Sequence, residues 1–210
     1  MIAAFDTCGA WVCAAVGERG AVQSQVRRAA RLNHNEVLPL VYGAMEVAEP
    51  LSALAVNQGP GSFTGTRVGV AFAAGLAQAI GVRVLPVSSF VVAASLAPEG
   101  AGRVRVAMPL VREVWGVGVL VRRGGNWHEE SCDEVTESEF RKLDRLDALI
   151  SPWADWPDSI QPPPDWNPAV TVLNLALARD PQDFVSPRSL SVRYLGKCQA
   201  ERVFEARHER

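Results

Sequence analysis

Short apolar runs separated by glycines dominate the first thirty residues. Residues 2–6 form one run, a second extends from Trp11 to Val16, and a third covers 21–26 after a turn at 17–20. Apolar runs of this length, punctuated by glycine, are typical of a β-meander. The pattern therefore predicts three consecutive strands at the start of the chain.

The apolar pattern changes its period after residue 33. Apolar residues recur at helical spacing over 37–48, and Asn33 with Glu36 resembles a capping box. Because a proline is tolerated only near the first turn of a helix, Pro39 favours a start at 34–38. We expect this helix to end near residue 48.

The segment from residue 53 to 96 alternates between strand and helix patterns. It contains, in order, a strand, a glycine-rich loop, a helix, a strand and a second helix, at 53–56, 58–62, 64–80, 82–87 and 88–96. Gly81 follows the long helix and Ser88 precedes the short one, and these residue types close and open helices. The alternation predicts an α/β fold with parallel strand pairing.

The pattern is weaker in the second half of the chain. The glycine- and proline-containing segment 98–102 predicts a boundary between two subdomains, 1–99 and 100–210. We expect strands at 104–107, 114–121, 127–129, 148–150 and 191–195, and helices at 137–146, 169–178 and, in part, in the charged tail 200–210.

Six prolines and three tryptophans lie between Pro152 and Pro168. This composition indicates an extended loop. The loop either forms a recognition surface or folds back and buries its tryptophans.

Composition excludes several classes of protein. The chain has 210 residues, enough for a core without disulfides, and its formal charge of −2 excludes a generally basic nucleic-acid-binding surface, although not a local basic patch. No apolar run of about 18 residues and no signal peptide is found. The four cysteines form no C-x-x-C pair, so we expect reduced thiols in a cytoplasmic protein.

Two polar segments are candidates for phosphate chemistry. Asp6 and Thr7 follow the first strand, and Gly59, Gly61 and Ser62 lie between a strand and a helix. A strand-end carboxylate and hydroxyl can face a phosphate or its metal ion, and glycines at a helix N-terminus can approach an anion. The simpler interpretation is that Asp6 caps backbone amides and that the glycines form a specialised turn. The P-loop lysine is absent, and no cofactor is expected.

Metal-based chemistry is not expected. The three histidines lie far apart, without an H-x-x-x-H or H-E-x-x-H spacing, so a histidine-based metal site is improbable. His34 at a helix start is interpreted as a local hydrogen-bonding residue. The basic trio of Arg27, Arg28 and Arg31 can touch phosphate or an acidic partner, but a solvated cluster is favoured.

Small residues form two stripes on the predicted helix 64–80. They recur every four residues on adjacent faces, at Gly65, Gly69, Ala73 and Ala77 and at Ala71, Gly75 and Ala79. Each interior glycine costs about 0.5–1 kcal/mol of helix stability relative to alanine, so a close contact must offset that cost. Packing within the domain needs only one face, which leaves the other for a partner helix.

Four segments carry a resemblance to a known family. They are Asp6-Thr7, His34-Asn35-Glu36-Val37-Leu38-Pro39-Leu40, the run from Gln58 to Gly69, and Pro86-Val87-Ser88-Ser89. These resemble the D-T-S, H-S-E-x-L-L-P, G-P-G-S-F-T-G-x-R-x-G and G-V-S-S motifs of the bacterial TsaB (YeaZ) family. The resemblance covers residues 1–96 closely, and beyond residue 100 only Glu113-Val114-Trp115 and Arg193-Tyr194-Leu195 look familiar.

The sequence departs from the family pattern at three places. Cys8 and Asn35 stand where serine is usual in the family. Residues 108–112 replace the Asp-Ala-Arg run that usually precedes the Glu-Val-Tyr of the second subdomain. The resemblance therefore supports the first subdomain better than the second.

The resemblance implies an actin-like (ASKHA, ribonuclease H-like) fold with two related subdomains. It also implies a non-catalytic scaffold that binds a TsaD-like catalytic subunit and a TsaE-like ATPase. Together these proteins form N6-threonylcarbamoyladenosine at adenosine 37 of tRNA, which this chain contacts only through the complex. A homodimer is expected when the chain is alone.

The family likeness further implies a partner interface on the helices at 34–48 and 64–80. The residues assigned to it are His34, Glu36, Leu38, Val41, Met45, Gly65, Arg67, Gly69, Phe72, Ala73 and Leu76. The rival hypothesis is a small ASKHA phosphotransferase or nucleotide hydrolase that uses Asp6 and the 59–65 loop. A glycoprotease would need a metal or nucleophile site, and none is recognised in the sequence.

Overall fold

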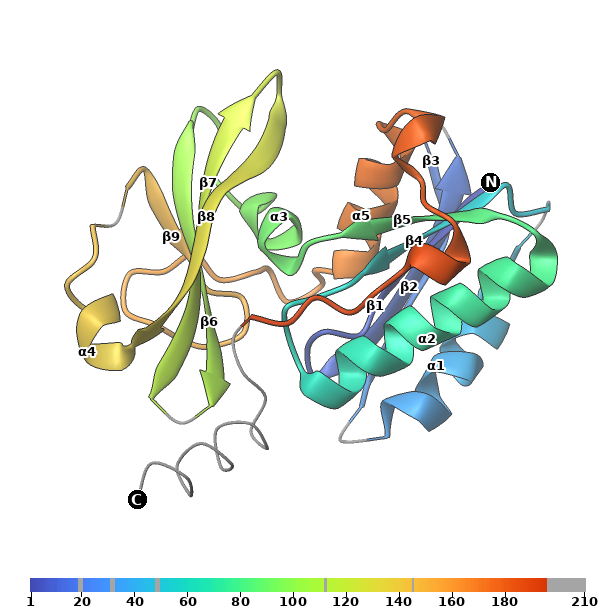
Figure 1. Cartoon of the computed structure of the whole chain (residues 1–210), viewed down its shortest axis with the longest axis horizontal. Coiled ribbons are helices and arrows are strands. Elements are labelled where there is room, and N and C mark those ends of the chain that lie inside the picture. Colours follow the sequence, from blue (N-terminus) through green and yellow to red (C-terminus); the bar gives the residue numbers. More distant parts are fainter. Residues whose placement is uncertain (19–20, 31–32, 48–49, 112, 145, 196–210) are drawn as a thin grey trace. The chain divides into compact units, whose positions relative to one another are not determined.

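The computed structural model describes residues 1–18, 21–30, 33–47, 50–111, 113–144 and 146–195 (Figure 1). The chain divides into two compact units. Unit 1 comprises Met1–Ser95 and Pro163–Arg193, and unit 2 comprises Leu96–Pro162 and the residues from Tyr194 onward. Residues 163–193 were expected in the second subdomain. They belong to unit 1 because an apolar helix in this segment packs on its sheet.

Unit 1 is built on a five-stranded sheet. Its strands are β1 (Ile2–Asp6), β2 (Trp11–Glu18), β3 (Ala21–Ala29), β4 (Ala53–Asn57) and β5 (Arg83–Val87), in the order β3-β2-β1-β4-β5. The first three strands pair antiparallel, whereas β1, β4 and β5 pair parallel. The predicted meander and the predicted parallel pairing are both confirmed.

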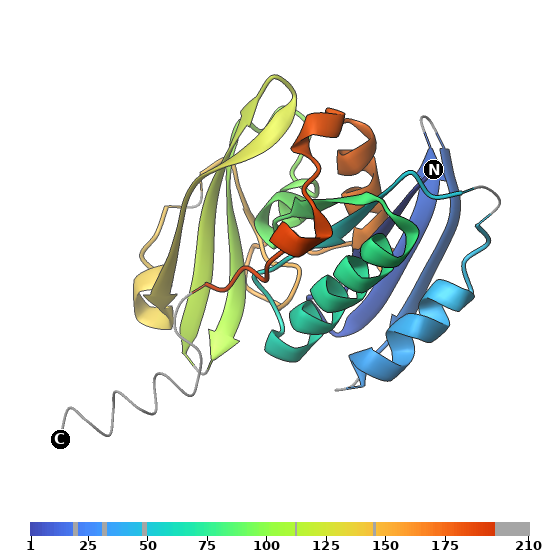
Figure 2. The same cartoon turned by 45° about the vertical axis from the view of Figure 1, so that its right-hand side comes forward.

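Helices cover both faces of this sheet. They are α1 (His34–Gly43), α2 (Phe63–Ile80), α3 (Ser89–Ala94) and α5 (Pro168–Leu177). Figure 2 shows α1 and α2 side by side on one face, with α5 on the other. The strand residues alternate accordingly: Phe5 packs with α1 and α2, whereas the neighbouring Ala4 packs with α5.

The ends of α1 and α2 differ in how well the sequence predicted them. Ser62 caps α2 by accepting a hydrogen bond from the Gly65 amide at 3.2 Å, and Gly81 closes it with a φ of +74°. Helix α1 ends at Gly43, before the predicted end near 48. Asn33 makes no side-chain capping bond, so the capping-box interpretation is wrong. Its backbone carbonyl accepts the first helical bonds instead.

Unit 2 contains a four-stranded sheet. Its strands are β6 (Arg103–Val111), β7 (Val114–Arg123), β8 (Asn126–Thr136) and β9 (Ala148–Ile150), in the order β8-β7-β6-β9. Only the β6–β9 pair is parallel. The antiparallel strands are longer than predicted, since polar residues continue the ladder on exposed positions of β8.

Two expectations for the second half are wrong, and a third concerns residues that the structure does not describe. Helix α4 spans only Glu137–Phe140 rather than 137–146, and 191–195 forms no strand. Two 3₁₀ turns precede that segment, at Pro181–Asp183 and Pro187–Ser189. The tail 200–210 lies outside the described residues, as do Arg31 and Arg112.

The segment between Pro152 and Pro168 is a loop that folds back onto unit 2 through Trp156. The Trp156 ring lies 4.8 Å from Trp115 and 4.7 Å from Phe140, centroid to centroid. Trp115 and Phe140 are themselves stacked at 5.0 Å. For Trp156, the folded-back alternative is therefore the one that the structure supports.

Candidate functional site

The carboxyl ends of β1 and β4 meet at one edge of the unit 1 sheet. Asp6 ends β1, and Asn57 ends its parallel neighbour β4. Directly after Asn57, the loop at 58–62 leads into α2. We call residues 6–9, 57–65 and Gly69 the strand-end junction.

A buried hydrogen-bond network connects the polar side chains of this junction. The Asp6 carboxylate accepts from the Cys8 amide at 3.0 Å and from Asn57 Nδ2 at 2.5 Å. Asn57 Oδ1 in turn accepts from the Gly59 amide at 3.0 Å and from Ser89 Oγ at 2.8 Å. Sequence reasoning missed Asn57 and Ser89. The sequence signal that could have found them is their position: Asn57 ends β4 and Ser89 closely follows β5, and both strands run parallel to β1.

Burial governs the ionisation of the junction. It raises the pKa of the Asp6 carboxyl, although the hydrogen bonds from Asn57 and Cys8 oppose this effect. Burial also raises the pKa of the Cys8 and Cys13 thiols, and the negative charge of Asp6 adds to it. Both cysteines are therefore protonated thiols at neutral pH, unlike the thiolates that act as nucleophiles.

Backbone contacts explain the glycines of the junction. A Cβ at Gly61 would lie 2.6 Å from the Cys8 carbonyl oxygen, and one at Gly59 would lie 2.6 Å from that of Arg193. At Gly65 and Gly69, a Cβ would overlap the carbonyl oxygen and the hydroxyl of Thr7, respectively. These glycines let the end of β1 pack directly against the start of α2.

The groups that were candidates for phosphate binding form hydrogen bonds within the junction instead. Thr7 Oγ1 donates to the Gly65 carbonyl at 2.7 Å, and the Ser62 amide donates to the Cys8 carbonyl at 2.7 Å. The arrangement therefore favours the interpretation of Asp6, Thr7, Gly59, Gly61 and Ser62 as a specialised turn. In the described part of the chain, no three His, Cys, Asp or Glu side chains gather where they could hold a metal ion.

His34 lies beside the junction at the start of α1. Its Nε2 is 3.0 Å from the Gly9 carbonyl oxygen, and because a carbonyl only accepts, Nε2 carries the proton. The buried Nδ1 has no hydrogen-bond partner among the described residues. His34 thus acts as a hydrogen-bonding residue, but its partner lies 25 residues away in the sequence rather than within the start of α1.

The two small-residue stripes of α2 differ in burial. The stripe of Gly65, Gly69, Ala73 and Ala77 is buried in unit 1, whereas Ala71, Gly75 and Ala79 are exposed. Apart from the adjacent backbone of α2 itself, no atom of the described residues lies within 4 Å of the position that a Gly75 Cβ would occupy. Packing inside this chain therefore requires a small residue only on the first stripe.

This orientation revises the residues assigned to a partner interface. Seven of them are enclosed by the chain itself, namely His34, Leu38, Val41, Met45, Gly65, Gly69 and Ala73. Phe72 and Leu76 are half-buried, and Glu36 and Arg67 are exposed. The seven enclosed residues pack under the helices and do not offer a docking surface.

The exposed positions of the two helices form a largely uncharged surface. We call it the outer helix face; its residues are Asn35, Glu36, Pro39, Leu40, Gly43, Phe63, Thr64, Arg67, Ala71, Gly75, Gln78, Ala79 and Ile80. Leu40, Phe63 and Ile80 are 60%, 46% and 44% exposed. The charged residue on the α2 part is Arg67, whose guanidinium lies 3.6 Å from the Phe63 ring centroid.

The basic residues near the end of β3 make contacts within the chain itself. Arg27 lies 4.1 Å over the Trp11 ring and donates to the Trp166 carbonyl at 2.6 Å. Arg28 is exposed, in keeping with a solvated cluster. Separately, none of the described helices is both long and apolar enough to cross a membrane.

Comparisons with known proteins agree with the motifs at the junction. The family model of TsaD, tRNA N6-adenosine threonylcarbamoyltransferase, matches residues 25–111. The tRNA threonylcarbamoyladenosine biosynthesis protein TsaB of Escherichia coli (strain K12) is 29% identical over 170 residues, which cover 75% of this chain and 74% of that protein.

Two solved structures from Pseudomonas aeruginosa share the fold. YeaZ is 22% identical with a TM-score of 0.73, and covers 92% of this chain and 99% of its own. A protein described as similar to peptidase YeaZ is 19% identical with a TM-score of 0.72, with coverages of 93% and 99%. The mixed α/β fold with two sheets, consistent with an actin-like fold, is thereby confirmed. The matches support the assignment of this chain to the TsaB (YeaZ) family, as the motifs of residues 1–96 predicted.

Proposed function

We propose that this chain is a non-catalytic scaffold subunit in the biosynthesis of N6-threonylcarbamoyladenosine in tRNA. It docks through the outer helix face onto a TsaD-like catalytic subunit. The observation that carries this proposal is an exposed, nearly uncharged face on α2, with a glycine that the chain's own packing does not require. The TsaB relative of Escherichia coli supports the pathway.

The composition of the outer helix face favours a protein partner. A helix face that remains in water is normally rich in charged and polar residues. On α2, one of the eight exposed positions is charged, and the others include Phe63, Ala71, Ala79 and Ile80. Gly75 weakens the helix by about 0.5–1 kcal/mol relative to alanine, with no gain from packing inside the chain. Close approach of a partner helix would offset that cost.

The strand-end junction favours a subunit without chemistry of its own. Its carboxylate, hydroxyl and loop amides bind one another, and the β1 end fills the space in front of the glycines. A phosphotransferase would need these groups for nucleotide and metal. The structure therefore gives the rival hypothesis no specific support.

The remaining partners follow from the docking proposal. A TsaE-like ATPase joins the complex, and tRNA is reached through the partner subunits, in keeping with the net charge of −2. When the chain is alone, the outer helix face pairs with a second copy in a two-fold symmetric dimer, because such a face lowers its exposed apolar area by self-association.

We predict that Gly75→Leu weakens binding of a TsaD-like subunit by at least about tenfold, because the side chain blocks close helix approach while open space leaves the fold intact. Titration calorimetry measures the affinity, and thermal melting checks the fold. Asn174→Leu, at an exposed position of α5 on the other sheet face, is the matched control and should bind as the wild type does. Unchanged binding of a folded Gly75→Leu variant would contradict the proposed face.

Alanine at two glycines of α2 should change stability in opposite directions. Gly69→Ala lowers the free energy of unfolding by about 1–3 kcal/mol, since its methyl group overlaps the Thr7 hydroxyl. Gly75→Ala raises it by about 0.5–1 kcal/mol, because the methyl group meets open space in a helix. Chemical denaturation measures both values. If both substitutions changed the free energy of unfolding equally, the assignment of an inward and an outward stripe would be wrong.

Nucleotide chemistry separates the scaffold from its rival. We expect the purified chain to bind Mg·ATP poorly and to hydrolyse none at a meaningful rate, since the Asp6 carboxylate is held by Cys8 and Asn57. Calorimetry and a phosphate-release assay measure this. Micromolar affinity, with turnover that Asp6→Asn abolishes, would establish the phosphotransferase instead.

A further inference from the structure

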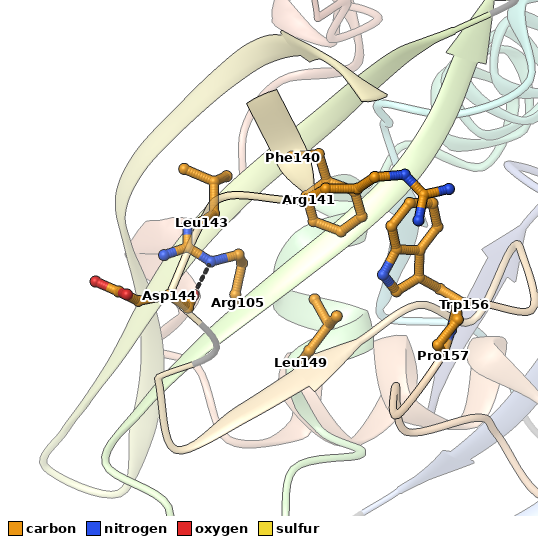
Figure 3. A pocket seen from close by; sticks show the side chains of 8 residues that line it. All are labelled: Arg105, Phe140, Arg141, Leu143, Asp144, Leu149, Trp156 and Pro157. Atoms are coloured by element: carbon orange, nitrogen blue, oxygen red, sulfur yellow. Dashed lines mark hydrogen bonds between the residues drawn. The ribbon is translucent and has the colours of Figure 1, made fainter. Parts of the chain in front are cut away.

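Unit 2 contains a cavity that the proposed scaffold function does not use. Its volume is about 180 Å³, and it is partly open to solvent. Its lining comes from β6 and from three neighbouring segments within residues 140–157, namely α4 with the turn that follows it, β9, and the tryptophan- and proline-rich loop (Figure 3). Its apolar lining consists of Phe140, Leu143, Leu149, Trp156 and Pro157. These side chains form an aromatic and aliphatic wall, and Arg105, Arg141 and Asp144 complete the lining with polar groups.

A buried cation lines the same cavity. Arg105 on β6 is only 9% exposed, and its Nε donates to the backbone carbonyl of Asp144 at 2.7 Å. No ion pair within 4.0 Å and no second hydrogen bond joins this guanidinium to the described residues. Since a guanidinium carries five N–H donors, most of its capacity is free for a ligand.

The charge of Arg105 is costly where it lies. Burial lowers the pKa of its guanidinium, and the nearby negative charge of Asp144 only partly opposes this. An arginine nevertheless remains protonated at neutral pH. A partly buried charge without an ion pair within 4.0 Å favours an anion that enters the cavity.

The second arginine of the cavity is already paired. Arg141 forms an ion pair with Glu137, and its guanidinium lies 4.7 Å from the Trp156 ring centroid. Figure 3 shows its guanidinium over the Trp156 ring. Arg105 is therefore the group that offers free donors to an anion.

We propose that this cavity is a binding site for a small aromatic carboxylate, whose ring packs against Phe140, Leu149 and Trp156 and whose carboxylate pairs with Arg105. The size fits one ring, because an apolar protein cavity of about 150 Å³ holds benzene, and this one has about 180 Å³. Drug-sized ligands and nucleotides occupy pockets of about 300 Å³ or more, so the smaller volume favours a single ring. The planar fork of an arginine matches a carboxylate in two parallel hydrogen bonds.

Benzoate is the probe that tests the site on the full-length chain. Titration calorimetry or NMR compares it with benzamide, which has the same shape without the charge, and with acetate, which lacks the ring. We expect benzoate to bind at least about tenfold more tightly than either, since a charge-assisted pair and the ring contacts both contribute.

Variants assign the binding to Arg105. Arg105→Met keeps the apolar stem and should weaken benzoate at least about tenfold. Arg103→Met is the matched control: it lies on the same strand, is exposed and pairs with Glu130, and should bind as the wild type does. Asp144→Asn keeps the backbone carbonyl and removes a competing negative charge, so it should bind benzoate at least as tightly as the wild type.

Three results would overturn the proposal: no saturation by benzoate up to about 10 mM, equal affinity for benzamide, or unchanged affinity in folded Arg105→Met. If Arg105→Met fails to fold, the benzoate and benzamide comparison on the wild type decides the charge requirement. Arg105→Lys, which keeps the charge without the fork, then tests the residue itself and should bind more weakly than the wild type.

Discussion

The close approach of the β1 end to the first turns of α2 is the constraint on which unit 1 depends. Thr7 and Cys8 lie so near to Gly61, Gly65 and Gly69 that a single Cβ at any of these positions would overlap them. Successive residues of a helix are about 100° apart, so two glycines turned inward fix the rotation of the whole helix. Ala71, Gly75 and Ala79 are thereby turned outward. The outer helix face is a consequence of the junction.

The same contact limits the chemistry of the strand end. Asp6 and Thr7 would be well placed to meet a phosphate if the loop at 58–62 stood away from them. Instead they bind Asn57, the Cys8 amide and the Gly65 carbonyl. Asp6 is buried with its pKa raised, which disfavours the ionised carboxylate that a metal ion would need. The proposed scaffold role, with its exposed helix face, accounts for both features.

Local signals were sufficient for much of unit 1. Apolar runs and Gly81 located the strands and α2 closely, and the four-residue spacing found both small-residue stripes. Spacing alone could not tell which stripe packs inside, because that depends on Thr7, 58 residues away from Gly65.

The cover of the second sheet face could not be predicted locally either. Helices α1 and α2 lie on one face of the sheet, and α5, which comes from the second half of the chain, packs on the other face.

Unit 2 was harder to predict for the same physical reason. The role of Trp156 depends on rings from β7 and α4, and the burial of Arg105 depends on a turn and a loop beyond β6. In the sequence, Arg105 is one arginine in an alternating strand, without any local sign that it lines a cavity. Its significance arises only from the fold.

Hydrogen–deuterium exchange of this chain, alone and in complex with a TsaD-like subunit, tests the central claim most directly. The account predicts added protection in α1 and α2, whose exposed residues form the outer helix face, with little change in α5 on the opposite side of the sheet. The chain alone should be measured at a concentration low enough to keep it monomeric. Protection confined to α5 or to unit 2, with α1 and α2 unchanged, would contradict the account.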